Sequence, residues 1–415
     1  MDYQECLDFL FSRLPMYQNE GKSAYKKDIT NTIKLLDFIG NPQHDLKCIH
    51  VAGTNGKGSV SSMLAATLTQ SGYKTGLYTS PHLLDFTERI RIDGIQIPQK
   101  NVIEFVAKTK GIINDIEPSF FELTVAMAFD YFKSENIDVA VIEVGLGGRL
   151  DSTNVIEPDL SVITSIGWDH MDLLGNSLEA IAYEKSGIIK KDTPVVYSRF
   201  IPLEAIGVII QKANSETAPH YPSELAPASL SAALMLKGTY QRHNIDTFYT
   251  AIEVLKRLGY TISWEAAHTA LANVTKLTGL KGRWEKLQDH PTVICDTGHN
   301  AEAMPFLMEQ LEADYKNLPK FFIWGMVADK DRPRILSLLP KNAHYYLVKP
   351  GVTRGYNAQQ LQEEMLQMGF NALAFEHFSE ALTHAKKEAL INGGIVFIGG
   401  STFLVADALL ACTPA

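Results

Sequence analysis

The residues with the clearest chemical meaning form a short loop, residues 53–59, with the sequence GTNGKGS. The loop follows an apolar run and precedes a segment with the apolar period of a helix. Backbone N–H groups at a helix start bind phosphate oxygens, and Lys57 adds a neutralising charge. The loop departs from the pattern G-x-x-x-x-G-K-[ST], because Val51 and Gly58 stand where a glycine and a hydroxyl belong. We expect a compact phosphate loop, with an ordinary glycine-rich turn as the alternative.

An acidic residue and a histidine follow later apolar runs. Glu143 ends the run VAVIE, and Asp169 and His170 follow LSVITSIGW. A buried carboxylate is costly unless it is paired or bound to a metal. We therefore expect Glu143 to serve a metal or phosphate site, with a salt bridge as the alternative. For His170, a ligand role and a structural role stay equally open.

Two further residues have plainer alternatives. Ser80 follows an expected strand, where a hydroxyl could reach a magnesium ion that bridges ATP phosphates, although such a residue commonly belongs to a turn. Lys185 lies in the expected helix SLEAIAYEKSGIIK, which Asn176 or Ser177 would cap. The residue pattern alone favours a solvated Lys185.

The stretch TVICDTGHNAEAM in the second half again places polar residues after an apolar run. Asp296 could accept hydrogen bonds from ribose hydroxyls, and His299 could approach phosphate near a helix that opens around Asn300. A helix cap and a surface histidine are the alternatives for these two residues.

The elements that must position these residues are predicted by apolar runs that alternate with amphipathic segments, the pattern of parallel strands joined by helices. We expect strands at 47–51, 75–79, 139–144, 160–165, 194–197, 292–295, 321–324, 345–348, 373–375 and 395–398. Several of these runs lack alternation, as in strands covered on both faces. Ligands collect where such strands end.

The predicted fold class is α/β with two domains. Residues 1–278 would form a P-loop ATPase domain with a mostly parallel sheet, and residues 279–415 a smaller Rossmann-like domain. The length of 415 residues agrees with about two domains. A cleft between the two domains is the expected place for a ligand.

Composition narrows the possible partners. The formal net charge of −9 argues against a broad nucleic-acid surface. The late stretch GGIVFIGGSTFLVADALLA is broken by glycines and Asp407, so it predicts no membrane span. The N-terminus has no secretory signal, and the four cysteines have no C-x-x-C spacing. We therefore expect a cytoplasmic protein with reduced cysteines.

Many motifs in one order resemble folylpolyglutamate synthase and dihydrofolate synthase, which belong to the Mur ligase superfamily. They are GKSAYKKDITNTIKLLDFIGNPQ, HVAGTNGKGSV, TSPHLLDFTERI, FFELTVAMAFDYF, EVGLGGRLDSTN, DHMDLLG, EKSGIIK, GRWE and DTGHN. The resemblance implies an ATP-dependent ligase that makes an amide in two steps. ATP phosphorylates a substrate carboxylate, and the amine of L-glutamate attacks the acyl phosphate. The substrate would be dihydropteroate or the γ-carboxylate of a reduced folate.

The resemblance also implies site residues, motif by motif. ATP would be bound by Gly53, Thr54, Asn55, Gly56, Lys57, Gly58, Ser59, Asn244, Arg283 and Asp296. Magnesium, as two ions, would be held by Ser80, Glu143 and His170. Catalysis would involve Lys57, His299 and Lys185, the last matching a lysine that is carbamylated in this family. Folate and glutamate would be bound by His82, Phe121, Asp151 and Ser401.

The chain departs from the family pattern at Phe403, where some members carry a tyrosine, which weakens the assignment of nearby Ser401. His82 in TSPHL is closer to members that accept dihydropteroate. A bifunctional synthase is therefore the first interpretation, and a folylpolyglutamate synthase alone is the second. Another Mur-type ligase would need a nucleotide domain before the loop, and a nucleotide switch would need a guanine-reading motif. An inactive relative does not fit the intact loop. We expect a monomer with small-molecule substrates.

Overall fold

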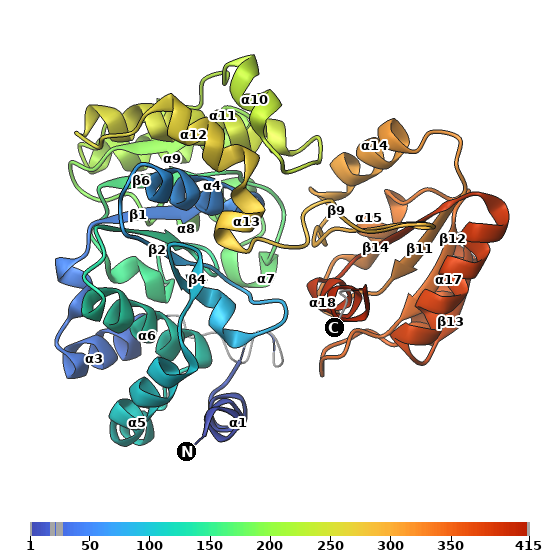
Figure 1. The fold of residues 1–415 in the computed structure, drawn as a ribbon, viewed down its shortest axis with the longest axis horizontal. Coiled ribbons are helices and arrows are strands. Elements are labelled where there is room, and N and C mark those ends of the chain that lie inside the picture. Colours follow the sequence, from blue (N-terminus) through green and yellow to red (C-terminus); the bar gives the residue numbers. More distant parts are fainter. Residues whose placement is uncertain (1, 17–20, 22–27, 413–415) are drawn as a thin grey trace. The chain divides into compact units, whose positions relative to one another are not determined.

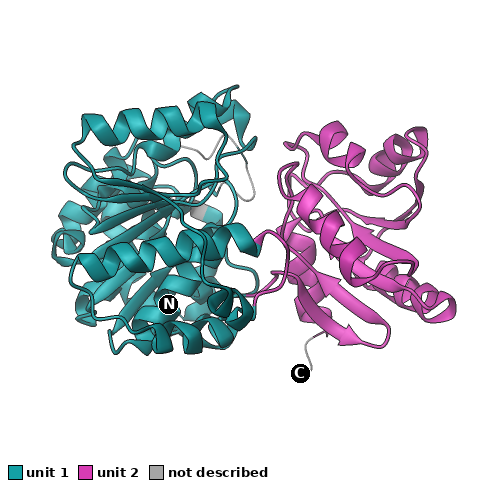
Figure 2. Cartoon of the chain, turned by 90° about the horizontal axis from the view of Figure 1, so that it is seen from above, with its two compact units in different colours: residues 1–235, 241–280 teal, residues 236–240, 281–415 magenta. Residues whose placement is uncertain are grey.

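The computed structural model describes residues 2–16, 21 and 28–412. Most of the predicted motif stretch GKSAYKK, at residues 22–27, lies outside the described residues. The chain divides into two compact units, shown in Figure 2. One contains Met1–Met235 and Gln241–Leu280, and the other contains Leu236–Tyr240 and Lys281–Ala415. The short segment Leu236–Tyr240 thus packs with the C-terminal part of the chain.

The first unit is built on an eight-stranded sheet with the order β4-β3-β2-β5-β1-β6-β7-β8. Its strands are β1 (Cys48–Ala52), β2 (Thr75–Tyr78), β3 (Ile90–Ile92), β4 (Ile95–Gln96), β5 (Val139–Glu143), β6 (Leu160–Ile163), β7 (Val195–Tyr197) and β8 (His220–Pro222). Six neighbouring strands of this sheet are parallel, namely β2, β5, β1, β6, β7 and β8. At one edge, β3 pairs antiparallel with β2 and β4 pairs antiparallel with β3. Every residue of β1, β5 and β6 is buried, as expected for strands covered on both faces.

Helices cover both faces of this sheet. Figure 1 shows α3, α5 and α6 on one face and α4, α11 and α12 on the other. The helices are α1 (Tyr3–Arg13), α3 (Thr30–Ile39), α4 (Lys57–Gln70), α5 (Gln99–Ile116), α6 (Phe120–Ser134), α7 (Met171–Leu174), α8 (Leu178–Ser186), α9 (Leu203–Ser215), α10 (Ala228–Ala233), α11 (Gln241–Arg257), α12 (Trp264–Ala272) and α13 (Val274–Thr278). Short 3-10 turns lie at η2 (Pro42–Asp45), η3 (Phe86–Arg89) and η4 (Ser152–Val155). Ser177 caps α8, as predicted, by accepting from the Ala180 N–H.

The second unit has a six-stranded sheet with the order β13-β12-β11-β14-β10-β9. Its strands are β9 (Glu285–Asp289), β10 (Thr292–Cys295), β11 (Lys320–Trp324), β12 (His344–Val348), β13 (Asn371–Phe375) and β14 (Ile395–Gly399). Only β9 runs antiparallel within this sheet. The helices are α14 (Met304–Asp314), α15 (Arg332–Ser337), α16 (Ala358–Gln367), α17 (Phe378–Asn392) and α18 (Thr402–Cys412).

Each strand predicted from an apolar run is present, and no strand end differs from its predicted position by more than two residues. The predicted class, α/β with a mostly parallel first sheet, is confirmed. The strands β3, β4, β8 and β9 were not predicted because they are short or carry exposed polar residues, as in EKLQD of β9. The helix predicted to open near Asn300 begins at Met304 instead, because the Asn300 side chain accepts from the Ala303 N–H and the chain turns first.

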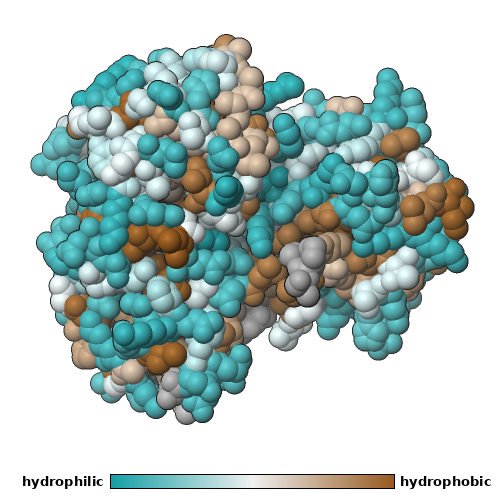
Figure 3. Space-filling view, viewed as in Figure 1, coloured by the Kyte–Doolittle hydropathy of each residue, from teal (hydrophilic) through white to brown (hydrophobic). Residues whose placement is uncertain are grey.

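The surface is mainly hydrophilic on the face in Figure 3, where hydrophobic areas are separated by polar ones. No helix in the described part of the chain combines the length and the apolar character that a membrane span requires. All four cysteines, Cys6, Cys48, Cys295 and Cys412, are free thiols.

Candidate active site

The predicted phosphate loop joins the end of β1 to the start of α4. Glycine is required at two of its positions. A Cβ at Gly53 would lie 2.0 Å from Thr164 Oγ1, and a Cβ at Gly56 would lie 2.3 Å from Asn244 Oδ1. Gly56 also has a φ of 87°, which side-chain-bearing residues rarely adopt. The loop therefore fits tightly against the chain that follows β6 and against α11.

Hydrogen bonds hold the loop in place from outside. Ser165 accepts from the Thr54 N–H through its carbonyl oxygen at 3.0 Å and from the Asn55 N–H through its hydroxyl at 2.8 Å. Thr164 Oγ1 donates to the Asn55 carbonyl at 2.6 Å. The Gly167 N–H donates to Thr54 Oγ1 at 3.0 Å. The loop is thus preformed, and sequence reasoning missed Thr164 and Ser165, whose only signal is their place directly after a buried strand.

Two lysine side chains converge on one carbonyl oxygen of the loop. Lys57 Nζ lies 2.9 Å and Lys185 Nζ lies 3.0 Å from the Gly53 oxygen. Lys185 is only 4% exposed, so the expectation of a solvated lysine is wrong. Burial, helped by the charge of Lys57, lowers the pKa of Lys185 to about 7, although the carboxylates of Asp169 and Asp151 oppose the shift. Near neutral pH a large fraction of this amine is therefore uncharged.

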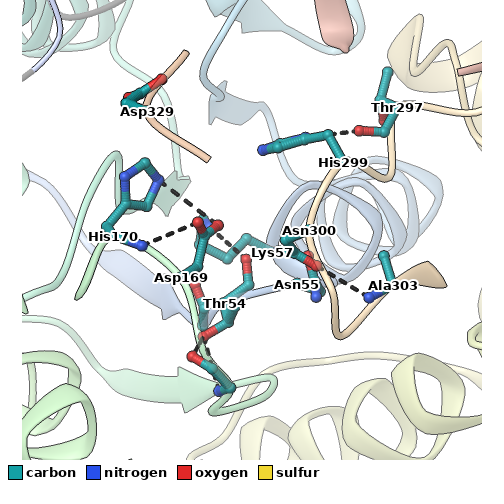
Figure 4. A network of polar contacts seen from close by, with 12 residues as sticks. Thr54, Asn55, Lys57, Asp169, His170, Thr297, His299, Asn300, Ala303 and Asp329 are labelled. Carbon is teal, nitrogen blue, oxygen red and sulfur yellow. Dashed lines mark hydrogen bonds and ion pairs between the residues drawn. The ribbon is translucent and has the colours of Figure 1, made fainter. Parts of the chain in front are cut away.

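Two of the predicted magnesium ligands lie together. Glu143 ends β5 and is 4% exposed, and its Oε2 accepts from the Ser80 N–H at 3.3 Å. His170 directly precedes α7 with a φ of 50°, and its N–H donates to Asp169 Oδ1 at 3.0 Å (Figure 4). Its Nε2 lies 3.7 Å from Asp169 Oδ2. In the described part of the chain, no group of three or more His, Cys, Asp or Glu side chains is arranged to hold a metal ion.

Ser59 and Asn244 are linked through a residue that was not predicted. Gln241 Nε2 donates to Ser59 Oγ at 3.3 Å, and Asn244 Nδ2 donates to Gln241 Oε1 at 2.8 Å. All three side chains are buried. Gln241 and Asn244 share a face of α11 because they are three residues apart, and this spacing in YQRHN was the available signal.

The predicted folate residues Phe121 and Asp151 both contact the loop after β5. A Cβ at Gly145 would lie 2.4 Å from Phe121 Cζ, so only glycine lets the backbone pass this ring. The Leu146 N–H donates to Asp151 Oδ2 at 2.8 Å. Asp151 is 3% exposed, and burial raises the pKa of its carboxyl.

His82 lies in a different setting. Arg89 Nε donates to His82 Nδ1 at 2.7 Å. Burial, helped by the charge of Arg89, lowers the pKa of His82 to about 3. The ring is therefore neutral at physiological pH and carries its proton on Nε2.

In the second unit, Asp296 follows β10 and is 2% exposed. Its Oδ2 accepts from the Tyr240 hydroxyl and the Trp284 N–H, each at 2.7 Å, and its Oδ1 accepts from the Gly298 N–H at 2.7 Å. Burial raises the pKa of this carboxyl. Tyr240 was not predicted, and its only signal was its place beside the YQRHN motif. Asp296 is thus held firmly inside its own unit.

Three other predicted residues of the second unit are bound to nearby backbone. Arg283 Nη1 contacts Thr297 Oγ1 and donates to the Gly282 carbonyl at 3.2 Å. His299 Nδ1 lies 2.9 Å from the Thr297 carbonyl, which only accepts, so the ring proton is on Nδ1 (Figure 4). Ser401 is buried, and its hydroxyl accepts from the N–H of Phe403 at 3.2 Å, at the start of α18.

Comparison with protein families agrees with this architecture. Residues 51–202 match the Mur ligase middle domain, and residues 282–402 match the Mur ligase glutamate ligase domain. The first match contains the loop, both lysines and Glu143. The second contains Asp296, His299 and Ser401.

Two relatives of known name are similar to this chain over most of its length. The Bacillus subtilis dihydrofolate synthase/folylpolyglutamate synthase is 34% identical over 371 residues, covering 82% of this chain and 84% of the relative. The Escherichia coli protein of the same name is 30% identical over 380 residues, covering 84% and 83%.

Among solved structures, Escherichia coli FolC in complex with DHPP and ADP has a TM-score of 0.84 at 26% identity and covers 99% of this chain and 97% of that chain. The Mycobacterium tuberculosis folylpolyglutamate synthase complexed with ADP has a TM-score of 0.87 at 27% identity and covers 100% and 98%. The chain therefore belongs to the dihydrofolate synthase/folylpolyglutamate synthase family of Mur ligases.

Proposed function

We propose that this chain is a bifunctional ATP-dependent ligase that adds L-glutamate to dihydropteroate and to the γ-carboxylate of reduced folates. Relatives of this chain are named for both reactions, and a similar structure holds DHPP and ADP. The observation that carries the proposal is the preformed loop with Lys57 and Lys185 on the Gly53 carbonyl. It supplies the phosphate site that the first reaction step needs.

The chemistry converts a poor electrophile into a reactive one. A carboxylate oxygen attacks the γ-phosphorus of ATP, the bond to ADP breaks, and an acyl phosphate forms. The glutamate amine then attacks the acyl carbon and releases phosphate. Lys57 and the N–H groups at the start of α4 stabilise the charge on the phosphate oxygens as the first bond forms.

Lys185 is proposed to react with carbon dioxide. Its neutral amine attacks carbon dioxide, forms an N–C bond and releases one proton, which leaves a carbamate anion. The lowered pKa of about 7 supplies the neutral amine that this step requires. Replacing Lys185 with alanine should abolish most turnover, and a short carboxylate in the buffer should restore part of it. Unchanged turnover in Lys185→Ala would contradict this role.

Two magnesium ions are proposed as cofactors, with Ser80, Glu143 and His170 as ligands. The hydroxyl and carboxylate oxygens of Ser80 and Glu143 suit magnesium, and the burial of Glu143 fits a carboxylate that binds a cation. When bound, magnesium neutralises charge on the transferring phosphate.

The remaining assignments concern substrate binding. We propose Phe121, Asp151 and His82 for the pterin end of the folate, and Asn244 and Asp296 for adenine and ribose. Arg283, His299 and Ser401 would serve the phosphates and the incoming glutamate. The rigid bonding of Asp296 by three donors supports a binding role rather than proton transfer.

The free cysteines and the use of ATP support a cytoplasmic enzyme, and we propose that it acts as a monomer. Size-exclusion chromatography with light scattering checks the oligomeric state, and a dimer mass would contradict it.

The proposed function is tested by ADP release from the purified chain with magnesium, ATP and L-glutamate. Dihydropteroate and tetrahydrofolate are offered separately. Release with both acceptors is expected. Release with tetrahydrofolate alone would show a folylpolyglutamate synthase only, and release with neither would contradict the proposal.

A further inference from the structure

His50 is a fully buried histidine in the middle of β1 that the proposed chemistry does not use. Its Nε2 lies 2.8 Å from Thr153 Oγ1. Thr153 is also 0% exposed, and its hydroxyl lies 2.6 Å from Asp151 Oδ1. The three side chains form an unbroken chain of polar contacts that begins inside the sheet and ends on a carboxylate.

The direction of these hydrogen bonds follows from the number of protons. The Thr153 hydroxyl has one proton. Asp151 also accepts from the Thr153 N–H at 3.0 Å and from the Leu146 N–H at 2.8 Å, which suits an ionised carboxylate. The hydroxyl proton therefore points to Asp151, and Thr153 Oγ1 accepts from the Nε2–H of His50.

The reverse direction is disfavoured. A protonated Asp151 that donated to Thr153 would make the hydroxyl donate to His50, and the ring proton would move to Nδ1. That nitrogen is buried and has no hydrogen-bond partner. A buried N–H without an acceptor is destabilising. Burial also keeps the ring neutral, because it lowers the pKa of His50 to about 3.

Asp151 lies beside the other proposed folate residue. The Leu146 N–H that binds Asp151 Oδ2 belongs to the same loop in which Gly145 passes the ring of Phe121. One oxygen of the carboxylate is thus held by this loop and the other by Thr153. Together they prevent the carboxylate from rotating and determine which lone pairs stay available to a ligand.

We propose that His50, acting through Thr153, positions the Asp151 carboxylate to recognise the pterin ring of the folate substrate. This inference rests on the proposed function and deepens it. His50 is a positioning residue and touches no substrate. Outer partners of this kind typically change ligand affinity when they are removed.

The first test compares His50→Leu and Thr153→Val with the wild type. Each variant should raise the KM for dihydropteroate about tenfold and leave the KM for ATP within about twofold. The reason is that the hydrogen-bonded chain His50–Thr153–Asp151, called the relay below, ends at Asp151 and not at the phosphate loop. A general packing defect would raise both constants or lower kcat alone. Either of those results would overturn the inference.

Matched variants guard against misfolding. Thr153→Ser keeps the hydroxyl and should keep the wild-type KM. His50→Gln places an amide N–H near the position of Nε2 and should recover most of the affinity for dihydropteroate. Failure of both conservative variants would overturn the relay. The double variant His50→Leu/Thr153→Val should be no worse than either single variant, whereas additive effects would overturn it.

The second test needs no substrate. Nitrogen NMR of histidine-labelled protein should show His50 protonated on Nε2 and not titrating between about pH 5 and 8. A proton on Nδ1 would overturn the relay. A wild-type chain without folate-dependent ADP release would overturn the proposed function and this inference together. An active wild type whose His50→Leu variant keeps its KM for dihydropteroate would overturn this inference alone.

Discussion

The phosphate-loop region of the first unit and the Asp296 region of the second unit both lie where buried parallel strands end, yet different contacts hold them. In the first unit, Lys185 reaches the Gly53 carbonyl across 132 positions of the chain, and Thr164 reaches Asn55 across 109. These contacts exist only when the strands and helices have assembled.

In the second unit most contacts are local. Asp296 accepts from Gly298 two positions away and from Trp284 twelve positions away. His299 bonds the Thr297 carbonyl two positions away. Tyr240, 56 positions away, is a distant partner of Asp296. The first region therefore depends on partners that lie far away in the sequence, whereas most of the contacts named in the second region join residues close to each other in the sequence.

The largest effect is expected from Lys57→Ala, because it removes a fixed positive charge next to the phosphate loop. Turnover should fall by at least about a hundredfold. The measurement is ADP release under saturating substrates. Lys191→Ala removes an exposed lysine of the same unit and is the matched control. Equal activity of the two variants would show that Lys57 has no catalytic role, and the phosphate-loop region would then no longer differ from the Asp296 region in its importance for turnover.

Glu143→Ala should lower turnover by about a hundredfold and raise the magnesium concentration needed for half-maximal rate. The buried carboxylate is the only predicted metal ligand at the end of β5. Circular dichroism should show an unchanged fold. A variant with wild-type magnesium dependence would contradict the assignment.

The burial of Lys185 predicts a dependence of stability on pH. Its folded pKa of about 7 lies below the unfolded value of 10.5, so between these values the unfolded chain binds more protons. Stability must therefore rise with pH in this window. Relative to Lys185→Met, the wild type should gain roughly 2 kcal/mol of unfolding free energy from pH 7 to pH 9.

Denaturant titrations in buffer free of carbon dioxide measure this gain. Lys191→Met, which removes an exposed lysine, should follow the wild type at both pH values. A Lys185→Met variant whose stability changes in parallel with the wild type would show that the amine is not desolvated.

The smallest effect is expected in the second unit. Tyr240→Phe removes one of the three donors to Asp296 and leaves the backbone donors in place. The KM for ATP should rise about fivefold, which corresponds to roughly 1 kcal/mol for one hydrogen bond. Tyr346→Phe, the same change in β12, is the control. If Tyr240→Phe lowered activity as much as Lys57→Ala, the two regions would be equally important for the reaction.

Much of the fold was predictable because its signal is local. Apolar runs without alternation, such as VAVIE at 139–143, predicted the buried parallel strands. The exposed edge strand β9 was missed because its residues are polar. In the site, the loop glycines and Lys57 were recognisable by spacing, whereas Thr164 and Tyr240 were not, since ordinary residue types acquire a role only through distant partners.

The sequence by itself determined the order of strands and helices, the phosphate loop and the family motifs, because periodicity and residue type are written along the chain. The tertiary structure alone decided that Lys185 is buried against Gly53 and that His50 reaches Asp151 through Thr153. The physical reason is that burial and the proximity of distant charges set the energy of an ionisable group, and neither is a property of neighbouring residues in the sequence.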